Sequence, residues 1–366
     1  MNNTNKDLEA RHRRYFQLST QLAHLDNEHL NALFAENEQT RGWGVNHTIE
    51  LHGANIFVKK IPLTALEYEN LFSTKNLYDL PTFYNYGVGS AGFGAFRELV
   101  THIKTTNWVL AGEVENFPLM YHYRIVPNHK EPQPLEAEKY QRYVQYWNDD
   151  KNIEKFGIER RHAKYEIVLF LEYFPQDLWR WFGENLDKTE SIIIEMRETI
   201  SFLRKNGVIH FDVHFGNVVT DGTHFYLVDF GLILDKQFDL SEAERLFFNE
   251  NSHYDYGELL FSIGSHIPDV YDDLSEAKKK EIASLIGLED GMKDHKRFVC
   301  LLENIDAICA QGLMSLEASY IECVKRYKDI ILLHDGFFAD MRDNNKKDTK
   351  FENEKLKQLL HEGLLS

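Results

Sequence analysis

Three polar residues between positions 212 and 229 have the types and the spacing needed to handle a phosphorylated substrate. Asp212 and Asn217 lie close together in HFDVHFGNVV, and Asp229 follows in VDFG after a polar turn. Carboxylate and amide oxygens suit Mg²⁺, which neutralises phosphate oxygens, and a further carboxylate can orient an attacking hydroxyl. The pattern predicts that Asn217 and Asp229 hold the metal and that Asp212 accepts the hydroxyl proton.

These two stretches resemble the catalytic and metal-binding loops of the protein-kinase superfamily, H-x-D-x-x-x-x-N and D-F-G. A helix that ends just before the first loop, in ISFLRKNGVIHFD, is also typical of that family. The resemblance covers about residues 40–265 and implies an α+β, bilobal protein-kinase-like fold, with a small sheet-rich N-lobe and a larger helical C-lobe. It implies a phosphotransferase that uses ATP and Mg²⁺ and moves the γ-phosphate to a hydroxyl, with Ser or Thr of a protein as the first choice.

The resemblance also assigns an ATP-binding lysine and its carboxylate partner. Lys59 in IFVKK corresponds to the lysine of V-A-I-K that holds the α- and β-phosphates, and strand alternation directs Lys60 to the opposite face. Glu98 in AFRELVTHI corresponds to the glutamate that braces this lysine, but it follows the lysine by 39 positions, which implies an insertion. Glu67 and Glu69 are nearer alternatives.

Further nucleotide-binding positions are implied on either side of the lysine. Gly42 and Gly44 in RGWG stand where a kinase has its glycine-rich loop. FLEYFPQDLWRWF resembles the fifth strand and the hinge, with Leu171 as the gatekeeper and the backbone of Glu172 and Phe174 binding adenine. The hinge would thus place the base, and the glycines would allow the backbone to approach the phosphates.

Departures from protein kinases leave the acceptor open. Phe211 replaces the arginine that usually precedes the catalytic aspartate, and no A-P-E follows, so we expect activity without an activation-loop switch. His214 gives D-x-H-x-x-N, as in aminoglycoside and choline kinases, which makes a small-molecule hydroxyl the alternative acceptor. A pseudokinase scaffold and an adenylyltransferase on the same fold are further alternatives.

Asp255 in YDYGELLFSIG resembles the kinase helix aspartate that braces the catalytic loop.

A second glycine pattern, in YGVGSAGFG, matches G-x-G-x-x-G at Gly87, Gly89 and Gly92. It follows the lysine strand instead of preceding it, and it lacks the second parallel strand that a dinucleotide-binding unit requires. We interpret it as a flexible turn into a helix over residues 95–107, with a lid or insertion loop near the nucleotide as the alternative.

The elements that must position these residues follow from the hydrophobic periodicity. A hairpin that turns at His52 and Gly53 and strands over 117–126 and 165–174 indicate a sheet, and the chain after residue 240 has the periodicity of helices. The chain therefore divides into a helical extension, an N-lobe with insertions, a mostly helical C-lobe and a charged tail. Their predicted bounds are 1–37, 38–172, 173–342 and 343–366.

The composition of the chain limits the classes of function that it can have. The 366-residue chain has a net charge of −17, which disfavours binding to nucleic acid, and its three cysteines show no metal-ligand or disulfide spacing. No apolar run approaches the roughly 20 residues needed to span a bilayer. These features disfavour nucleic-acid binding and a membrane span, and we expect a cytoplasmic protein; they leave the oligomeric state undetermined.

Overall fold

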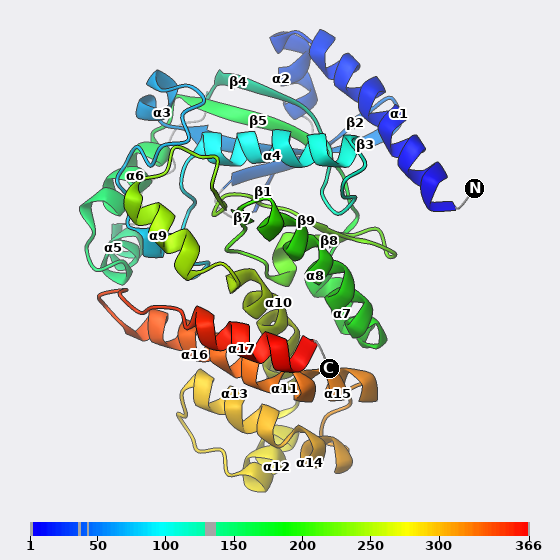
Figure 1. Cartoon of the computed structure of the whole chain (residues 1–366), viewed down its shortest axis with the longest axis vertical. Coiled ribbons are helices and arrows are strands. Elements are labelled where there is room, and N and C mark those ends of the chain that lie inside the picture. Colours follow the sequence, from blue (N-terminus) through cyan, green and yellow to red (C-terminus); the bar gives the residue numbers. More distant parts are fainter. Residues whose placement is uncertain (1–2, 36–37, 42–43, 129–136, 365–366) are drawn as a thin grey trace. The chain divides into compact units, whose positions relative to one another are not determined.

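The computed structural model describes residues 3–35, 38–41, 44–128 and 137–364. It has the expected mixed α+β character, with antiparallel strands mainly in the first half of the chain and helices in the second (Figure 1).

The chain divides into two compact units. The first takes in the N-terminal helices, the predicted range 38–172 and a short later segment, and the second takes in the predicted tail. Lys59, Glu98 and Asp229 belong to the first unit, whereas Asp212 and Asn217 belong to the second. The first unit comprises residues 1–175 and 226–243, and the second comprises residues 176–225 and 244–366.

A five-stranded antiparallel sheet forms the centre of the first unit, in the order β1-β2-β3-β5-β4. The predicted hairpin is confirmed, since His52 and Gly53 join β2 to β3 with the two positive φ angles, 51° and 77°, of a type I′ turn. The strands of the first unit are β1 (Glu38–Arg41), β2 (Gly44–Leu51), β3 (Ala54–Leu63), β4 (Met120–Pro127), β5 (Tyr165–Glu172) and β10 (Leu234–Asp235), and β9 (Phe225–Leu227) spans the unit boundary.

Helix α4 covers one face of this sheet (Figure 1). Its Phe96 and Leu99 are buried against Ile61 and Leu63 of β3, and this packing fixes the position of the intervening Glu98. The helices of the first unit are α1 (Asn3–His24), α2 (Asn27–Ala35), α3 (Ala65–Glu69), α4 (Ala95–Leu110), α5 (Ala137–Tyr146) and α6 (Lys151–Arg161), with a 3-10 helix at Thr82–Asn85.

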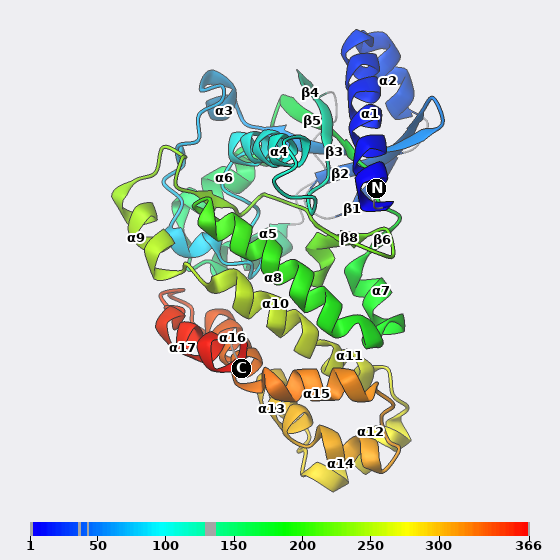
Figure 2. The same ribbon diagram turned by 45° about the vertical axis from the view of Figure 1, so that its right-hand side comes forward.

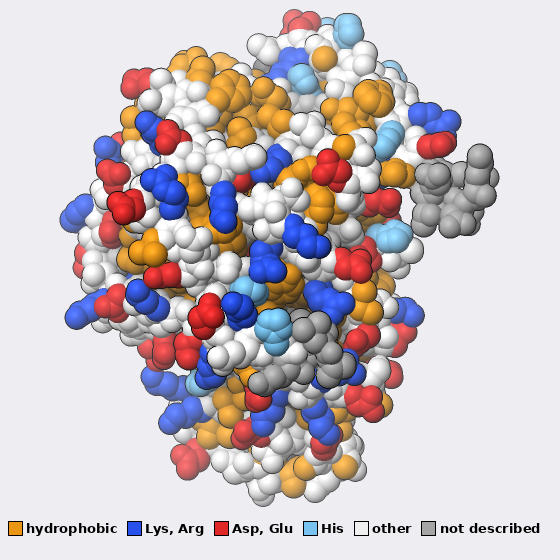
Figure 3. Space-filling model, viewed as in Figure 1, with side chains coloured by type: hydrophobic (Ala, Val, Ile, Leu, Met, Phe, Trp, Pro, Cys, Tyr) orange, Lys and Arg blue, Asp and Glu red, His pale blue; other side chains and the backbone are white. Residues whose placement is uncertain are grey.

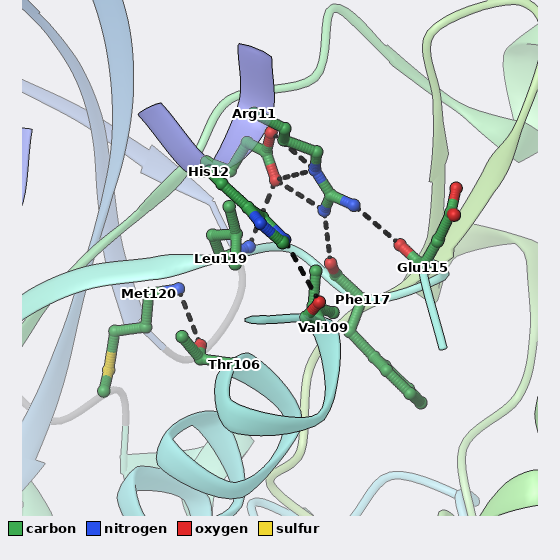
Figure 4. Close-up of polar contacts among 9 residues, drawn as sticks. Arg11, His12, Thr106, Val109, Glu115, Phe117, Leu119 and Met120 are labelled. Atoms are coloured by element: carbon green, nitrogen blue, oxygen red, sulfur yellow. Dashed lines mark hydrogen bonds and ion pairs between the residues drawn. The ribbon is translucent and has the colours of Figure 1, made fainter. Parts of the chain in front are cut away.

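The predicted N-terminal helical extension forms two helices, and Arg11 of α1 ties it to the sheet. The Arg11 guanidinium donates to both carboxylate oxygens of Glu172, with the Nη2 to Oε2 contact at 2.7 Å. It also donates to the carbonyls of Glu115 and Phe117 (Figure 4). Both charged side chains are largely buried, with exposures of 12% and 8%. The paired donors of arginine match this geometry, which lysine cannot reproduce.

Removing this guanidinium is expected to destabilise the first unit. Arg11→Ala leaves the Glu172 carboxylate largely buried without its cation, which we expect to cost about 2–4 kcal/mol. Arg14→Ala, in an exposed position on the same helix, is the control and should change stability by less than about 0.5 kcal/mol. Urea unfolding measures both, and similar losses in the two variants would contradict this assignment.

Helices make up most of the second unit, and α10 lies beside α8 (Figure 2) and against α16. The predicted helix that ends before Gly207 is α8, and Gly207 has the positive φ expected at a helix C-terminus. The helices are α7 (Leu178–Glu184), α8 (Thr189–Lys205), α10 (Tyr254–Gly264), α11 (His266–Asp272), α12 (Glu276–Ile286), α13 (Asp294–Glu303), α14 (Ile305–Ala310), α15 (Ala318–Arg326), α16 (Lys328–Asp343) and α17 (Asn353–Leu364), and α9 (Glu242–Glu250) spans the unit boundary. Short elements are β6 (Gln176–Asp177), β7 (Val208–Ile209), β8 (Val218–Thr220) and 3-10 turns at Leu186–Lys188 and Phe215–Asn217.

Helix α17, which lies within the predicted tail, packs against α16 and buries Leu356 and Leu360. Phe351, just before this helix, is also buried. The predicted tail is rich in charge, but these three apolar side chains make it part of the helical core of the second unit.

His334 on α16 is fully buried among aromatic rings. Neither ring nitrogen has a hydrogen-bond partner among the described residues. Burial lowers the pKa of His334 to about 3, because the imidazolium would lose its hydration there. The rings around it belong to Tyr254, Phe261, Phe337, Phe338 and Phe351.

This buried imidazole should make stability fall as the pH falls. The unfolded state binds a proton below about pH 6.5 and the folded state does not, so we expect a loss of about 2 kcal/mol between pH 7 and pH 5 from His334 alone. His334→Leu should lack this contribution, whereas His361→Leu, at an exposed position, should keep it. Urea unfolding at the two pH values gives the difference, and parallel curves for wild type and His334→Leu would refute the assignment.

Acidic and basic side chains are interspersed over the face shown in Figure 3, so the net negative charge does not gather there into one acidic patch. Within the described part of the chain, none of the helices has the length and apolar character to cross a lipid bilayer.

Candidate functional site

Lys59, Glu98 and Asp229 meet in the first unit. The Lys59 ammonium lies 2.7 Å from Oε1 of Glu98 and 2.9 Å from Oδ1 of Asp229. The lysine comes from β3, the glutamate from α4 and the aspartate from the segment after β9. Three distant parts of the sequence thus place one cation between two carboxylates.

The electrostatics of this cluster keep the lysine charged. Burial alone would lower the pKa of Lys59, but the charges of Asp229 and Glu98 outweigh it and raise the pKa above its ordinary value. The Glu98 side chain is only 7% exposed, whereas that of Asp229 is 45% exposed. Glu98 is therefore enclosed as a partner of the lysine, while Asp229 leaves part of its carboxylate open to solvent, where it could reach a cation.

The two neighbouring lysines of β3 point to opposite faces of the sheet, as strand alternation predicts. Lys60 lies 3.3 Å from Glu166 and 4.2 Å from the centre of the Phe34 ring, on the face away from Glu98. Lys59 shares the other face with Ile61, which packs toward α4. The structure therefore places Lys59, and not Lys60, beside Glu98 and Asp229.

The nearer glutamates do not pair with Lys59. The Glu67 carboxylate accepts the backbone N–H of Thr64 at 2.9 Å and that of Ala95 at 2.8 Å. Glu67 thus caps α3, and it also accepts the backbone N–H of the first residue of α4, a donor that has no partner within the helix. Glu69 is exposed. Glu67 therefore helps to place the helix that carries Glu98.

Asp229 has a backbone conformation that is uncommon for a residue with a side chain. Its φ angle is 63°, in the left-handed region, which surrounding contacts must stabilise. The next residue, Phe230, is fully buried, and its ring contacts His102 of α4 with ring centres 4.6 Å apart. The helix that carries Glu98 therefore also anchors the residue after Asp229.

The second unit holds Asp212 and Asn217 in one hydrogen-bonded loop. The Asn217 amide nitrogen donates to Oδ2 of Asp212 at 2.7 Å and to its carbonyl at 3.1 Å. This orientation directs the amide oxygen, the atom that suits Mg²⁺, away from Asp212. His214 accepts the Gly216 N–H at Nδ1, and its Nε2 lies 3.7 Å from Oδ1 of Asp212.

Two buried carboxylates of α10 brace this loop. Asp255 accepts the backbone N–H groups of His210 and Phe211 at 2.8 and 2.9 Å, as its resemblance to the kinase helix aspartate implies. Glu258, one turn later, accepts the N–H of Val213 at 2.7 Å. Burial raises the pKa of Asp255 to about 6 and raises that of Glu258 well above its ordinary value. Sequence reasoning missed Glu258, although an acid at i+3 from Asp255 in an apolar helix was an available signal.

Phe211, which stands in place of the expected arginine, anchors the loop through its ring. It is fully buried and contacts Phe247 and Tyr254, with ring centres 5.3 and 5.2 Å apart. Its φ angle of 64° lies in the left-handed region. The loop is thus held by apolar packing in addition to the carboxylates of α10.

Of the predicted adenine-binding residues, Glu172 ends β5 and Phe174 lies two residues beyond it. Leu171 is buried, and the Glu172 N–H donates to the Leu119 carbonyl at 2.8 Å. That donor is therefore engaged within the sheet, whereas the Phe174 ring packs against Tyr226 at 4.1 Å. Of the two predicted loop glycines, Gly44 begins β2 and Gly42 lies outside the described residues.

The glycine segment, defined as residues 85–94, leads into α4, which begins at Ala95 as the sequence predicts, and it is also hydrogen-bonded to a distant part of the chain. The Phe93 N–H donates to the Gly231 carbonyl at 3.0 Å, two residues after Asp229. The segment is thus bound to the same stretch that carries the predicted metal ligand.

A cavity of about 520 Å³ lies in the second unit between α13, α16 and α17, with His295, Asp329 and Lys355 in its lining. None of the residues predicted from the sequence lines it, so it gives no support to the candidate site.

Comparison with known proteins adds no assignment, since no protein-family model matches the chain and no curated protein matches it significantly.

Proposed function

We propose that the protein is a protein-kinase-like phosphotransferase that moves the γ-phosphate of ATP to a hydroxyl group. The observation that carries the proposal is the Lys59 ammonium held between Glu98 and Asp229, at 2.7 and 2.9 Å. A buried, charged lysine fixed by one enclosed carboxylate and one exposed carboxylate is suited to a triphosphate that is bound together with a cation.

Each residue has a role that follows from its surroundings. Lys59 would bind phosphate oxygens, and Glu98 would hold its ammonium in place. Asp229 and Asn217 would bind Mg²⁺ through oxygen, and the bound ion would neutralise charge on the triphosphate. Asp212 would orient the acceptor hydroxyl and take its proton. The proposal requires both groups of residues to act on one ATP, in a bilobal kinase-like arrangement.

The donor set fits this assignment and weighs against a scaffold without activity. Each predicted catalytic position carries the chemical group that the reaction needs, and the backbone donors of the loop around Asp212 are held by Asp255 and Glu258. A protein that only bound a partner would not need this arrangement. The hydroxyl of Ser or Thr in a protein is the proposed acceptor, and the D-x-H-x-x-N pattern around His214 favours a small molecule as the second candidate.

Transfer of label from ATP tests the proposal. Purified wild type, Asp212→Ala and Asp229→Ala are each incubated with a cell extract and with γ-labelled or α-labelled ATP. We expect label from the γ position only, in acid-precipitable protein, and loss of it in both variants. Label in the soluble fraction would move the acceptor to a small molecule, label from the α position would indicate adenylylation, and binding of ATP without transfer would reject the phosphotransferase.

A further inference from the structure

The glycine segment binds the backbone that follows Asp229 at two points. The Phe93 N–H donates to the Gly231 carbonyl at 3.0 Å, and the amide nitrogen of Asn85 donates to the Leu232 carbonyl at 2.7 Å. Asn85 is fully buried. These hydrogen bonds to two successive carbonyls restrict the peptide units that follow Gly231 and Leu232, two and three residues after Asp229.

Gly92 allows this approach because it has no side chain. Its φ angle is +96°, and a Cβ at this position would lie 3.0 Å from the Gly231 carbonyl oxygen. Gly89 has a similar φ angle, +103°, but a Cβ there would meet no atom closer than 4.0 Å, on Tyr146. Backbone conformation calls for glycine at both positions, whereas close contact with Gly231 calls for it only at Gly92.

The other side of the glycine segment is held by tyrosines. The Ala91 N–H donates to the Tyr84 hydroxyl at 2.9 Å, and the Tyr146 hydroxyl of α5 donates to the Val88 carbonyl at 2.8 Å. The Tyr84 hydroxyl is also hydrogen-bonded to that of Tyr143, again on α5. The segment is therefore fixed to α5 on one side and to the backbone after Asp229 on the other.

We propose that the glycine segment positions Asp229 for metal binding. This inference rests on the proposed function, in which Asp229 is a magnesium ligand. A left-handed backbone at an aspartate persists only where neighbouring contacts impose it, and the two hydrogen bonds to Gly231 and Leu232 supply such contacts. The segment touches neither Lys59 nor Glu98 through these bonds, so it acts on the site through the position of Asp229.

The matched pair Gly92→Ala and Gly89→Ala tests the inference. Both substitutions place a side chain on a left-handed backbone, so both should lower stability similarly. Only Gly92→Ala pushes against Gly231, and we expect it to raise the Mg²⁺ concentration needed for half-maximal γ-phosphate transfer about tenfold or more. Gly89→Ala should stay within about twofold of wild type, after correction for the folded fraction measured by circular dichroism.

A readout independent of activity uses the free protein. Hydrogen exchange of the Phe93 amide should accelerate at least tenfold in Gly92→Ala and remain near wild type in Gly89→Ala, because only the former disturbs the bond to Gly231. If Gly92→Ala does not fold, Asn85→Ala replaces it, since it removes the donor to Leu232 and adds no bulk. A rise in the Mg²⁺ requirement of several-fold is then expected.

The outcomes separate the two proposals. Suppose that wild type transfers phosphate and that the Mg²⁺ requirement is the same in Gly92→Ala, Asn85→Ala and Gly89→Ala. This result would overturn the positioning role and leave the proposed phosphotransferase activity intact. A wild type that transfers no phosphate would overturn the proposed function itself. Faster exchange of the Phe93 amide in Gly92→Ala with an unchanged Mg²⁺ requirement would also count against the positioning role.

Discussion

Asp229→Asn is expected to lower the rate of γ-phosphate transfer by about 10³-fold or more. The substitution replaces a negatively charged carboxylate by a neutral amide. In the wild type this carboxylate lies 2.9 Å from the Lys59 ammonium, and its side chain is 45% exposed. Losing a metal that stabilises transition-state charge by several kcal/mol corresponds to a factor of this size. Glu98 still faces the lysine in the variant, so Lys59 keeps one partner and the fold should persist.

The control for this variant is Asp239→Asn, an exposed position in the same unit where the carboxylate lies 3.5 Å from Lys75. Initial rates are measured at saturating ATP and several Mg²⁺ concentrations, and those of Asp239→Asn should be close to wild type. Asp229→Asn should stay slow, with a raised Mg²⁺ requirement. A rate for Asp229→Asn within tenfold of wild type would show that this carboxylate is not a metal ligand in the reaction.

Asp212→Asn is expected to lower kcat by about 10²–10⁴-fold, the range for loss of a positioned general base. The amide can still accept a hydrogen bond but cannot take the hydroxyl proton. Since Asp212 is not assigned to the nucleotide, the KM for ATP and the Mg²⁺ requirement should stay within a few-fold of wild type. This pattern differs from the one expected for Asp229→Asn, where the Mg²⁺ requirement rises.

Steady-state kinetics of Asp212→Asn should be compared with those of Asp187→Asn, an exposed aspartate of the same unit next to Lys188. In the wild type the Asn217 amide nitrogen donates to the Asp212 carboxylate, a contact that the substitution alters. Circular dichroism and hydrogen exchange of the loop are therefore needed to show that the variant keeps the loop structure. Retention of more than a tenth of the wild-type kcat would remove Asp212 from the reaction.

Local sequence patterns were sufficient for much of the first unit. The two-residue turn at His52 and Gly53 defined the hairpin, and strand alternation separated Lys59 from Lys60. Both follow from short-range geometry, which a single sequence contains. The pairing of Lys59 with Glu98 was harder to predict, because it depends on the tertiary packing of α4 against β3 and β5.

Other parts of the site depend on contacts between segments far apart in the sequence. The glycine pattern predicts a flexible turn because glycines permit many backbone conformations, and it cannot show the hydrogen bonds to Gly231, Leu232, Tyr84 and Tyr146 that hold the segment. Periodicity predicted a helix around Arg11 but could not show that its guanidinium binds Glu172. The i+3 spacing places Glu258 on the same side of its helix as Asp255, but only the folded structure shows that its carboxylate accepts a backbone N–H from the loop.

Calorimetric titration of ATP tests most directly the central claim, that Lys59, Glu98 and Asp229 bind a magnesium-bound triphosphate. The account predicts that wild type binds ATP at least tenfold more tightly with Mg²⁺ than with EDTA, and that Asp229→Asn loses this difference while its Mg²⁺-free affinity is unchanged. Equal affinities with and without Mg²⁺ in wild type, or an undiminished Mg²⁺ effect in Asp229→Asn, would contradict it.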